Sequence, residues 1–209
     1  MLRKAITASL FTLLCAAAGA VPFASGGSEP AKPVHQHPAG HPGGTPKALA
    51  PIIAAARLAT AKYATSLEAA RKAGYTVNVT QMIPDMGWHF LNPKITGFDP
   101  NKPPILVYEK RGKSWQLAAF EWVFTEKPAK APLPGAKYGS FPAACHYVDG
   151  TFVAAAAEAD CAKTSPQSGA AFGFWHPDFV TLHVWAWYPN PDGVYAGMNP
   201  LVRPFNDAT

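Results

Sequence analysis

Known catalytic signatures are missing from this chain of 209 residues. It contains no HExxH or Cys-x-x-Cys motif, no GxSxG nucleophile turn and no glycine-rich phosphate loop. Charged residues are scarce, at 15% of the chain, and the formal net charge of +5 is scattered rather than gathered on an arginine-rich face. The sequence therefore gives no support for a nucleic-acid partner, and no common enzyme class is indicated by a motif.

Long hydrophobic runs are absent from most of the chain. The apolar stretch Ala5–Ala18 is too short for a transmembrane helix, which needs roughly 20 residues. It follows the basic segment Met1–Lys4 and ends in Ala18-Gly19-Ala20, which has the small residues of a cleavage site. Residues 1–20 are therefore predicted to be a secretory signal peptide, so that the mature protein is secreted or periplasmic and has no membrane span.

The mature chain is expected to begin with a disordered tail. Residues 21–45 consist largely of Pro, Gly, Ala and Ser, and such a segment buries too little apolar surface to offset its conformational entropy. Its histidines, His35, His37 and His41, could hold Cu(II) or Zn(II) loosely, or could simply belong to a solubilising linker. Residues 46–205 are predicted to form a single domain.

Cysteine is also scarce, with three in the whole chain. Removal of the signal peptide leaves Cys145 and Cys161 as a pair. An even number of cysteines in an exported protein predicts a disulfide, although the same pair could instead ligate a metal ion. The bridge would close a loop of roughly 15 residues and stabilise the fold by about 3 kcal/mol in the chain-entropy model.

Hydrophobic periodicity predicts one long helix followed by strands. Between Lys47 and Ala73, apolar residues recur every three or four positions, as on the buried face of an amphipathic helix. Beyond this helix the strand candidates are Tyr75–Thr80, Gly87–Leu91, Ile105–Glu109, Ser114–Phe124, Thr151–Ala157 and Val180–Tyr188. The turn Lys110–Lys113 is expected to join two of them as a hairpin. The predicted fold is α+β, with one long N-terminal helix packed on a curved, mainly antiparallel β-sheet.

One acidic residue lies within a strand candidate that is apolar on both faces. Alternation puts Glu121 on one face with Val123 and puts Trp122 on the other. A carboxylate in such a strand is costly unless it is hydrogen-bonded, paired or bound to metal. Glu121 is therefore either a structural residue that accepts backbone hydrogen bonds or part of a functional site.

Three histidines lie in similarly apolar surroundings: His89, His183 and His176. A single histidine of this kind is more often a core residue than a ligand. Three of them together with a buried carboxylate could share a metal ion, and Zn, Cu or Fe suits such ligands. We therefore expect a metal site formed by His89, Glu121, His183 and His176, in a cavity walled by Trp88, Trp122, Trp185 and Trp187. His146 follows Cys145 and is expected near the surface, so it ranks below the other histidines.

Several short motifs resemble those of a group of uncharacterised exported bacterial proteins. They are Met86-Gly-Trp-His-Phe-Leu-Asn-Pro93, Leu106-Val-Tyr-Glu109, Ala119-Phe-Glu-Trp122 and the block LHVWAWYPNPDG, which ends at Gly193. The group carries variations on MGYHY…NP, LVYE, VEY and LHVWLW…NPDGMF…NP, and the resemblance covers residues 50–202. It implies a shared domain and no particular reaction. The match of His89, Glu121 and His183 to motif positions fits a shared site and equally a shared core.

Three classes of function follow from these patterns. A metal-binding protein is the leading hypothesis, and an open coordination position would allow the ion to activate water or a small oxidant. The alternative is a metal-free module in which the aromatic cavity binds a small molecule. A purely structural envelope protein is the third class. A glycosidase-like pair of carboxylates, Glu109 and Glu121, is not singled out by any motif.

Overall fold

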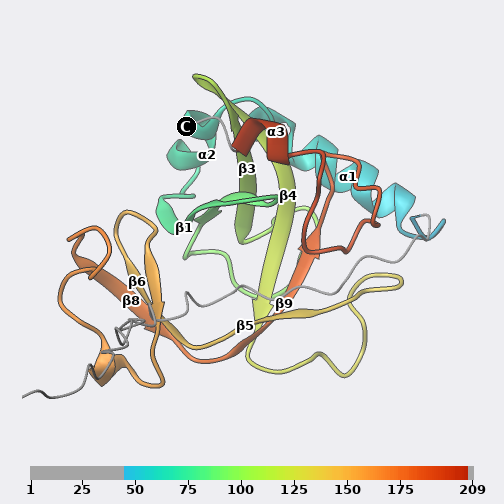
Figure 1. The fold of residues 1–209 in the computed structure, drawn as a ribbon. Coiled ribbons are helices and arrows are strands. Elements are labelled where there is room, and N and C mark those ends of the chain that lie inside the picture. Colours follow the sequence, from blue (N-terminus) through green and yellow to red (C-terminus); the bar gives the residue numbers. More distant parts are fainter. Residues whose placement is uncertain (1–44, 207–209) are drawn as a thin grey trace, which may run out of the picture. The chain divides into compact units, whose positions relative to one another are not determined.

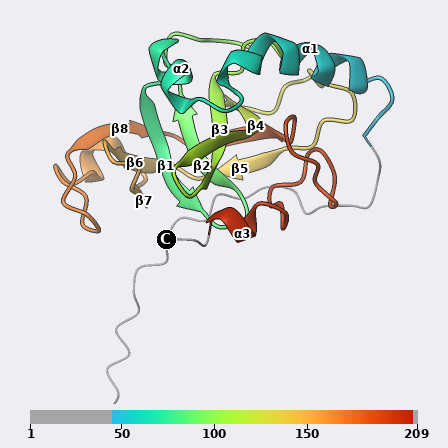
Figure 2. The same cartoon turned by 90° about the horizontal axis from the view of Figure 1, so that it is seen from above.

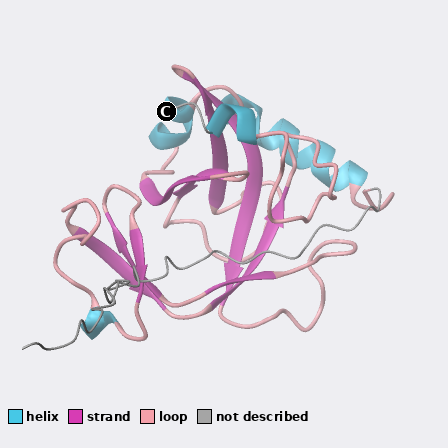
Figure 3. Cartoon of the chain, viewed as in Figure 1, coloured by secondary structure: helices cyan, strands magenta, loops and turns pink. Residues whose placement is uncertain are grey.

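Residues 45–206 are described by the computed structural model, and they form a mostly β structure (Figures 1 and 3). One curled antiparallel sheet, the larger sheet, has the strand order β1 (Val77–Ile83), β2 (Gly87–Leu91), β3 (Ile105–Arg111), β4 (Ser114–Phe124), β9 (Phe179–Val184) and β5 (Gly139–Phe141). The second sheet has the order β7 (Phe152–Ala154), β6 (Ala144–Tyr147) and β8 (Phe172–His176). The predicted signal peptide, and the predicted tail up to residue 44, lie outside the described residues.

Helices contribute little to the described part of the chain. The α-helices there are short, namely α1 (Ala50–Thr60), α2 (Leu67–Lys72) and α3 (Arg203–Asn206). Single 3-10 turns lie at Ala61–Tyr63 and Glu158–Asp160. The predicted α+β fold with one long N-terminal helix is therefore wrong, because the segment from Lys47 to Ala73 is broken into two helices and a turn.

The break in the helix is caused by hydrogen bonds to the larger sheet. The carbonyl oxygen of Tyr63 accepts a hydrogen bond from the hydroxyl of Tyr108, at 2.8 Å. The carbonyl oxygen of Ala64 accepts one from the backbone N–H of Leu117, also at 2.8 Å. Because these carbonyls are directed at the sheet, the regular helical ladder ends, and Ser66 begins α2 by accepting a hydrogen bond from the next turn. The apolar periodicity of a segment does not show which residues elsewhere in the sequence form hydrogen bonds with its backbone.

Several strand predictions are confirmed. The strands β2 and β4 have the predicted bounds. The predicted hairpin joins β3 and β4, with Arg111 paired to Ser114 across the turn. The strands β5, β6 and β8 were not predicted, because each has only three to five residues and too few positions to show an alternation.

The two faces of the larger sheet are covered by different elements. Helices α1 and α2 lie on one side of it and α3 lies on the other (Figure 2). On the helix-covered face, Phe90 and Trp122 pack in a core with Leu67 of α2. On the opposite face, Val107 packs in a smaller cluster with Val202, which precedes α3. Strand β4 is therefore covered on both sides, as its sequence indicated.

A disulfide joins Cys145 in β6 to Cys161, with the two Cα atoms 5.6 Å apart. This confirms the predicted pair and ties the central strand of the second sheet to the loop after the turn Glu158–Asp160. Within residues 45–206, no helix has the length and apolar character needed to cross a membrane.

Candidate functional site

Glu121 lies in a row of paired residues on the larger sheet. In β4 it is paired with Ile105 of β3 and with His183 of β9. Ile105 is in turn paired with Leu91 of β2. Because paired residues of antiparallel strands project from the same face, these side chains share one face of the sheet. His89, two residues before Leu91, projects from that face as well.

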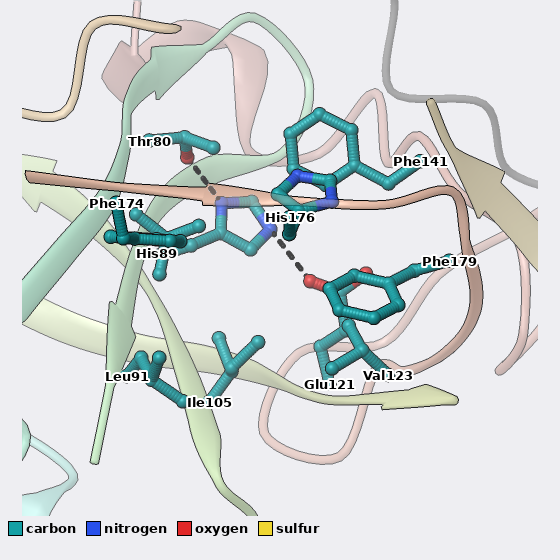
Figure 4. Close-up of a pocket in the computed structure, with 11 residues that line it drawn as sticks. Thr80, His89, Leu91, Ile105, Glu121, Val123, Phe141, Phe174, His176 and Phe179 are labelled. Atoms are coloured by element: carbon teal, nitrogen blue, oxygen red, sulfur yellow. Dashed lines mark hydrogen bonds and ion pairs between the residues drawn. The ribbon is translucent and has the colours of Figure 1, made fainter. Parts of the chain in front are cut away.

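This face borders a cavity of about 50 Å³, which we call the His–Glu cavity (Figure 4). Its polar lining residues are Thr80, His89, Glu121 and His176. The remaining lining residues are apolar: Val79, Leu91, Ile105, Val123, Phe141, Phe174 and Phe179. The cavity therefore combines predominantly apolar walls with a few polar groups, a common composition for a ligand site.

His89 and Glu121 form the polar centre of the cavity. Nε2 of His89 lies 3.6 Å from Oε2 of Glu121, and the two side chains are 1% and 2% exposed. The other ring nitrogen of His89, Nδ1, lies 2.7 Å from the hydroxyl oxygen of Thr80. Thr80 thus holds the imidazole ring in the orientation in which Nε2 faces the carboxyl group.

Burial determines the protonation of Glu121. The side chain is buried, and the loss of hydration raises its pKa to about 8. At neutral pH the carboxyl group therefore retains its proton. A buried carboxyl group with a raised pKa beside a histidine is typical of sites for binding and acid–base chemistry.

His183 lies beside this pair and is not among the described lining residues of the cavity. Its ring centroid is 6.3 Å from that of His89 and 4.8 Å from that of Trp185. The residue is 2% exposed and is paired with Glu121 across β4 and β9. The structure therefore brings three of the predicted site residues together on one face, although His183 is not among the described residues that line the cavity.

His176 reaches the cavity from the second sheet, at the end of β8. Its ring lies between those of Phe141 and Phe179, with centroids 4.7 Å from each. Nδ1 is 2.6 Å from the carbonyl oxygen of Pro177, which can only accept, so Nδ1 carries the proton and Nε2 is an acceptor. Burial lowers the pKa of His176 and so favours the neutral ring. Within residues 45–206, its Nε2 has no hydrogen-bond partner.

His146 is completely buried, contrary to the expectation of a surface position. Its ring stacks on Phe174 with centroids 4.6 Å apart and lies 4.9 Å from the ring of His176. Nδ1 donates a hydrogen bond to the carbonyl oxygen of Val79, at 2.8 Å. Burial, and then the nearby His176, lower the pKa of His146 to about 4 against the opposing effect of that hydrogen bond. His146 thus supports the inner side of the cavity wall, a role that the sequence analysis missed.

The tryptophans expected around the site lie elsewhere. Trp88 and Trp122 are sequence neighbours of His89 and Glu121, so they project from the opposite face and pack in the helix-covered core. Trp187 is part of the same core, and its indole N–H donates a hydrogen bond to α1. Trp185 is buried beside His183 and bonds to a backbone carbonyl. The aromatic walls of the His–Glu cavity are instead phenylalanines.

The candidate metal ligands of the described residues do not form a site with the three or four ligands that a metal ion needs. Within the part of the chain that the structure describes, no group of three or more His, Cys, Asp or Glu side chains is placed to hold a metal ion. Nε2 of His89 and a carboxyl oxygen of Glu121 lie 3.6 Å apart, which could suit two ligands of one ion. Structural zinc sites use four ligands and catalytic ones three, so this pair alone is too small a set.

A second buried carboxylate, Glu109, lies away from the cavity. It is paired with Arg111, whose Nη2 is 2.7 Å from its Oε1. Ile105 of β3 is paired with Glu121, and Glu109 follows Ile105 by four residues. Glu109 therefore lies about 13 Å further along the strand than the position opposite Glu121. The catalytic carboxyl groups of glycosidases lie within roughly 10 Å of each other, so Glu109 and Glu121 are not arranged for glycoside hydrolysis.

A wider hollow of about 340 Å³ lies between α1 and the loop that follows β9. Its described lining includes Ile53, Arg57, Trp185, Tyr188 and Asn190, with no histidine or carboxylate among the described residues. It offers room for a ligand but no group that can exchange a proton near neutral pH. The His–Glu cavity, in contrast, is lined by His89, Glu121 and His176.

Comparisons with known proteins add no family or fold assignment. No protein-family model, curated protein or solved structure matches the chain. The resemblance to exported bacterial proteins therefore remains a prediction, and function is inferred from the geometry of the site.

Proposed function

We propose that this protein binds a small molecule in the His–Glu cavity. The observation that carries the proposal is a buried polar pair, His89 and Glu121, at 3.6 Å in a cavity whose walls are otherwise mainly apolar. Ligand sites combine apolar walls with a few polar groups that fix the orientation of the ligand. Here the phenylalanines supply the apolar contact, and the pair together with His176 supplies the polar contact.

The volume of the cavity limits the size of the ligand. A cavity of about 50 Å³ has room for a molecule of only a few non-hydrogen atoms. Drug-sized ligands occupy cavities of roughly 300 Å³ or more, so this cavity is too small for them. Leu91, Val123, Phe174 and Phe179 are half-buried, and they indicate the side from which a ligand would enter.

The proposal is tested by NMR titration of the mature protein with ethanol, a small neutral probe. The imidazole signals of His89 and His176 should shift and reach saturation, with a dissociation constant on the order of 1 mM for so few atoms. The signals of the tail histidines, His35, His37 and His41, serve as internal controls and should not move. Unchanged signals of His89 and His176, or equal shifts of every histidine, would contradict the proposal.

A metal ion is the second candidate ligand, and one observation favours it. Thr80 holds Nδ1 of His89 while Nε2 faces a carboxyl group, and metal-binding histidines are commonly oriented through their other ring nitrogen. His183 and His176 would be the further ligands, and Zn, Cu or Fe suits this set. A metal ion is the weaker candidate, because no three His, Cys, Asp or Glu side chains within residues 45–206 are placed to hold one together.

Elemental analysis separates the two candidates. The tail must be deleted first, because its histidines could bind metal on their own. A stoichiometric metal that is lost in both His89→Ala and His183→Ala would favour the metal site. A metal-free protein that still binds ethanol after chelation would favour the cavity.

Export is the final part of the proposal. A disulfide such as Cys145–Cys161 persists in oxidising compartments, and residues 1–20 have the composition of a signal peptide. N-terminal sequencing of protein collected from the periplasm or the medium should find a chain that begins at Val21. A collected chain that still begins at Met1 would contradict cleavage.

A further inference from the structure

We infer that the ligand of the His–Glu cavity is a small alkylammonium ion, the protonated form of a short primary amine. The inference rests on the proposed function, because it specifies what the same cavity binds. Three features of the cavity lead to it: the hydrogen-bonding roles of its polar atoms, the sign of the charge that it can carry, and its aromatic walls.

The first feature is an acceptor that needs a donor. Nδ1 of His176 donates a hydrogen bond to the carbonyl oxygen of Pro177, at 2.6 Å. The other ring nitrogen, Nε2, is therefore unprotonated in the neutral ring and can accept a hydrogen bond. His176 is 5% exposed, and within residues 45–206 its Nε2 accepts no hydrogen bond. A buried acceptor without a donor destabilises a protein. A ligand that carries an N–H group would satisfy this atom.

The second feature is charge. Glu121 contributes a carboxyl group to the cavity, and the described lining contains no lysine or arginine. An anionic ligand would lose its hydration in this mainly apolar cavity without a cationic side chain to offset the loss. A cationic ligand would instead lower the pKa of Glu121, so that the carboxyl group releases its proton to solvent and the resulting carboxylate pairs with the ligand.

The third feature is the set of aromatic side chains around the cavity (Figure 4). Phe141, Phe174 and Phe179 all line it, and two of them flank His176 at 4.7 Å. Faces of aromatic rings attract cations, most strongly where water is excluded. An ammonium group would gain from both the rings and the carboxylate, whereas its short alkyl group would contact the aliphatic wall. A neutral alcohol of the same size would gain only the hydrogen bonds.

The inference is tested with three probes of nearly equal size: ethylammonium, ethanol and acetate. Each is titrated into the mature protein at neutral pH, and the imidazole signals of His89 and His176 report binding. Ethylammonium should bind at least tenfold more tightly than ethanol, and acetate should not bind. Binding of acetate, or equal affinities for ethylammonium and ethanol, would overturn the inference.

Two matched variants locate the charge that is responsible. Glu121→Gln keeps the shape of the side chain but cannot ionise, so the preference for ethylammonium over ethanol should vanish while ethanol still binds. Glu109→Gln is the control, because Glu109 is also buried but is paired with Arg111 and lies outside the cavity lining. Its preference should equal that of the unaltered protein. Loss of the preference in both variants would overturn the assignment of the charge to Glu121.

The possible results distinguish this inference from the function on which it rests. If ethanol binds and ethylammonium binds no better, the cavity is a ligand site but the charge argument fails. If none of the three probes affects His89 or His176, the proposed function fails as well. The comparison of probes uses the unaltered protein, so it decides the question even if Glu121→Gln does not fold.

Discussion

Nε2 of His89 lies 3.6 Å from a carboxyl oxygen of Glu121, and neither side chain is more than 2% exposed. The two residues come from strands that are not neighbours, since β3 lies between β2 and β4. The curl of the larger sheet therefore brings them together above Ile105 of β3, which is paired with Glu121. A polar pair that crosses an intervening strand in this way forms one side of the His–Glu cavity.

Glu121 should make the protein less stable as the pH rises. Its pKa is about 8 in the folded protein against an ordinary value of 4.5, so the folded state keeps a proton that the unfolded chain releases. Its contribution to the free energy of unfolding is greatest below pH 4.5, declines between pH 4.5 and about 8, and is constant above that range. Urea unfolding at a series of pH values should show this decline in the unaltered protein and not in Glu121→Gln. A constant difference between the two proteins across the range would contradict the prediction.

His146 should have the opposite effect: it should make the protein less stable as the pH falls. Its pKa falls from 6.5 to about 4 on folding, because of burial and the nearby His176. The stability that this depressed pKa provides is present above pH 6.5 and is lost as the pH falls towards 4. His146→Phe suits the stack on Phe174, and it should weaken the loss of stability between these pH values. The loss should not disappear, because burial also lowers the pKa of His176. An identical decline of the free energy of unfolding between pH 6.5 and about 4 in both proteins would contradict this account.

Gly87 should tolerate no side chain at the start of β2. Its φ is +119°, and an added Cβ would clash with the carbonyl oxygen of Tyr108. Gly87→Ala should lower the free energy of unfolding by about 3 kcal/mol or more. Gly112 is the matched control, because it also has a positive φ but no atom near an added Cβ. Gly112→Ala should cost about 1 kcal/mol, and equal losses in the two variants would show that the approach of Tyr108 is unimportant.

The disulfide should stabilise the second sheet. Replacing Cys145 and Cys161 by serine opens a loop of roughly 15 residues and should lower the free energy of unfolding by about 3 kcal/mol. A reducing agent should destabilise the unaltered protein by a similar amount and should leave the double variant unaffected. An unaltered protein that is indifferent to reduction, or that shows two free thiols after oxidative purification, would contradict the prediction.

The sequence was sufficient where the structure depends on local alternation. The strands β2 and β4 were predicted with correct bounds, because aromatic and aliphatic residues dominate both segments. The burial of His89, Glu121 and His183 followed from the same patterns. Alternation could also have shown that Trp88 and Trp122 project away from the site, because adjacent residues in a strand face opposite sides.

The rest depends on partners that are distant in the sequence. The helix breaks because carbonyls near Tyr63 bond to Tyr108 and Leu117, which lie more than forty residues further along the chain. The positions of His176 and His146 depend on the pairing of the short strands β8 and β6. These strands offered too few residues for a pattern, although the apolar neighbours of His146 were a weak sign that it is buried.

The central claim, that a small molecule occupies the His–Glu cavity, is tested most directly by filling it. Val123 lines the cavity and is half-buried, and Val153 of β7 is equally half-buried but outside the lining. The measurement is the affinity for ethanol, from the imidazole signal of His89, in Val123→Phe and Val153→Phe. We predict that Val153→Phe binds like the unaltered protein and that Val123→Phe binds at least tenfold more weakly while remaining folded. Undiminished binding in a folded Val123→Phe would contradict the claim.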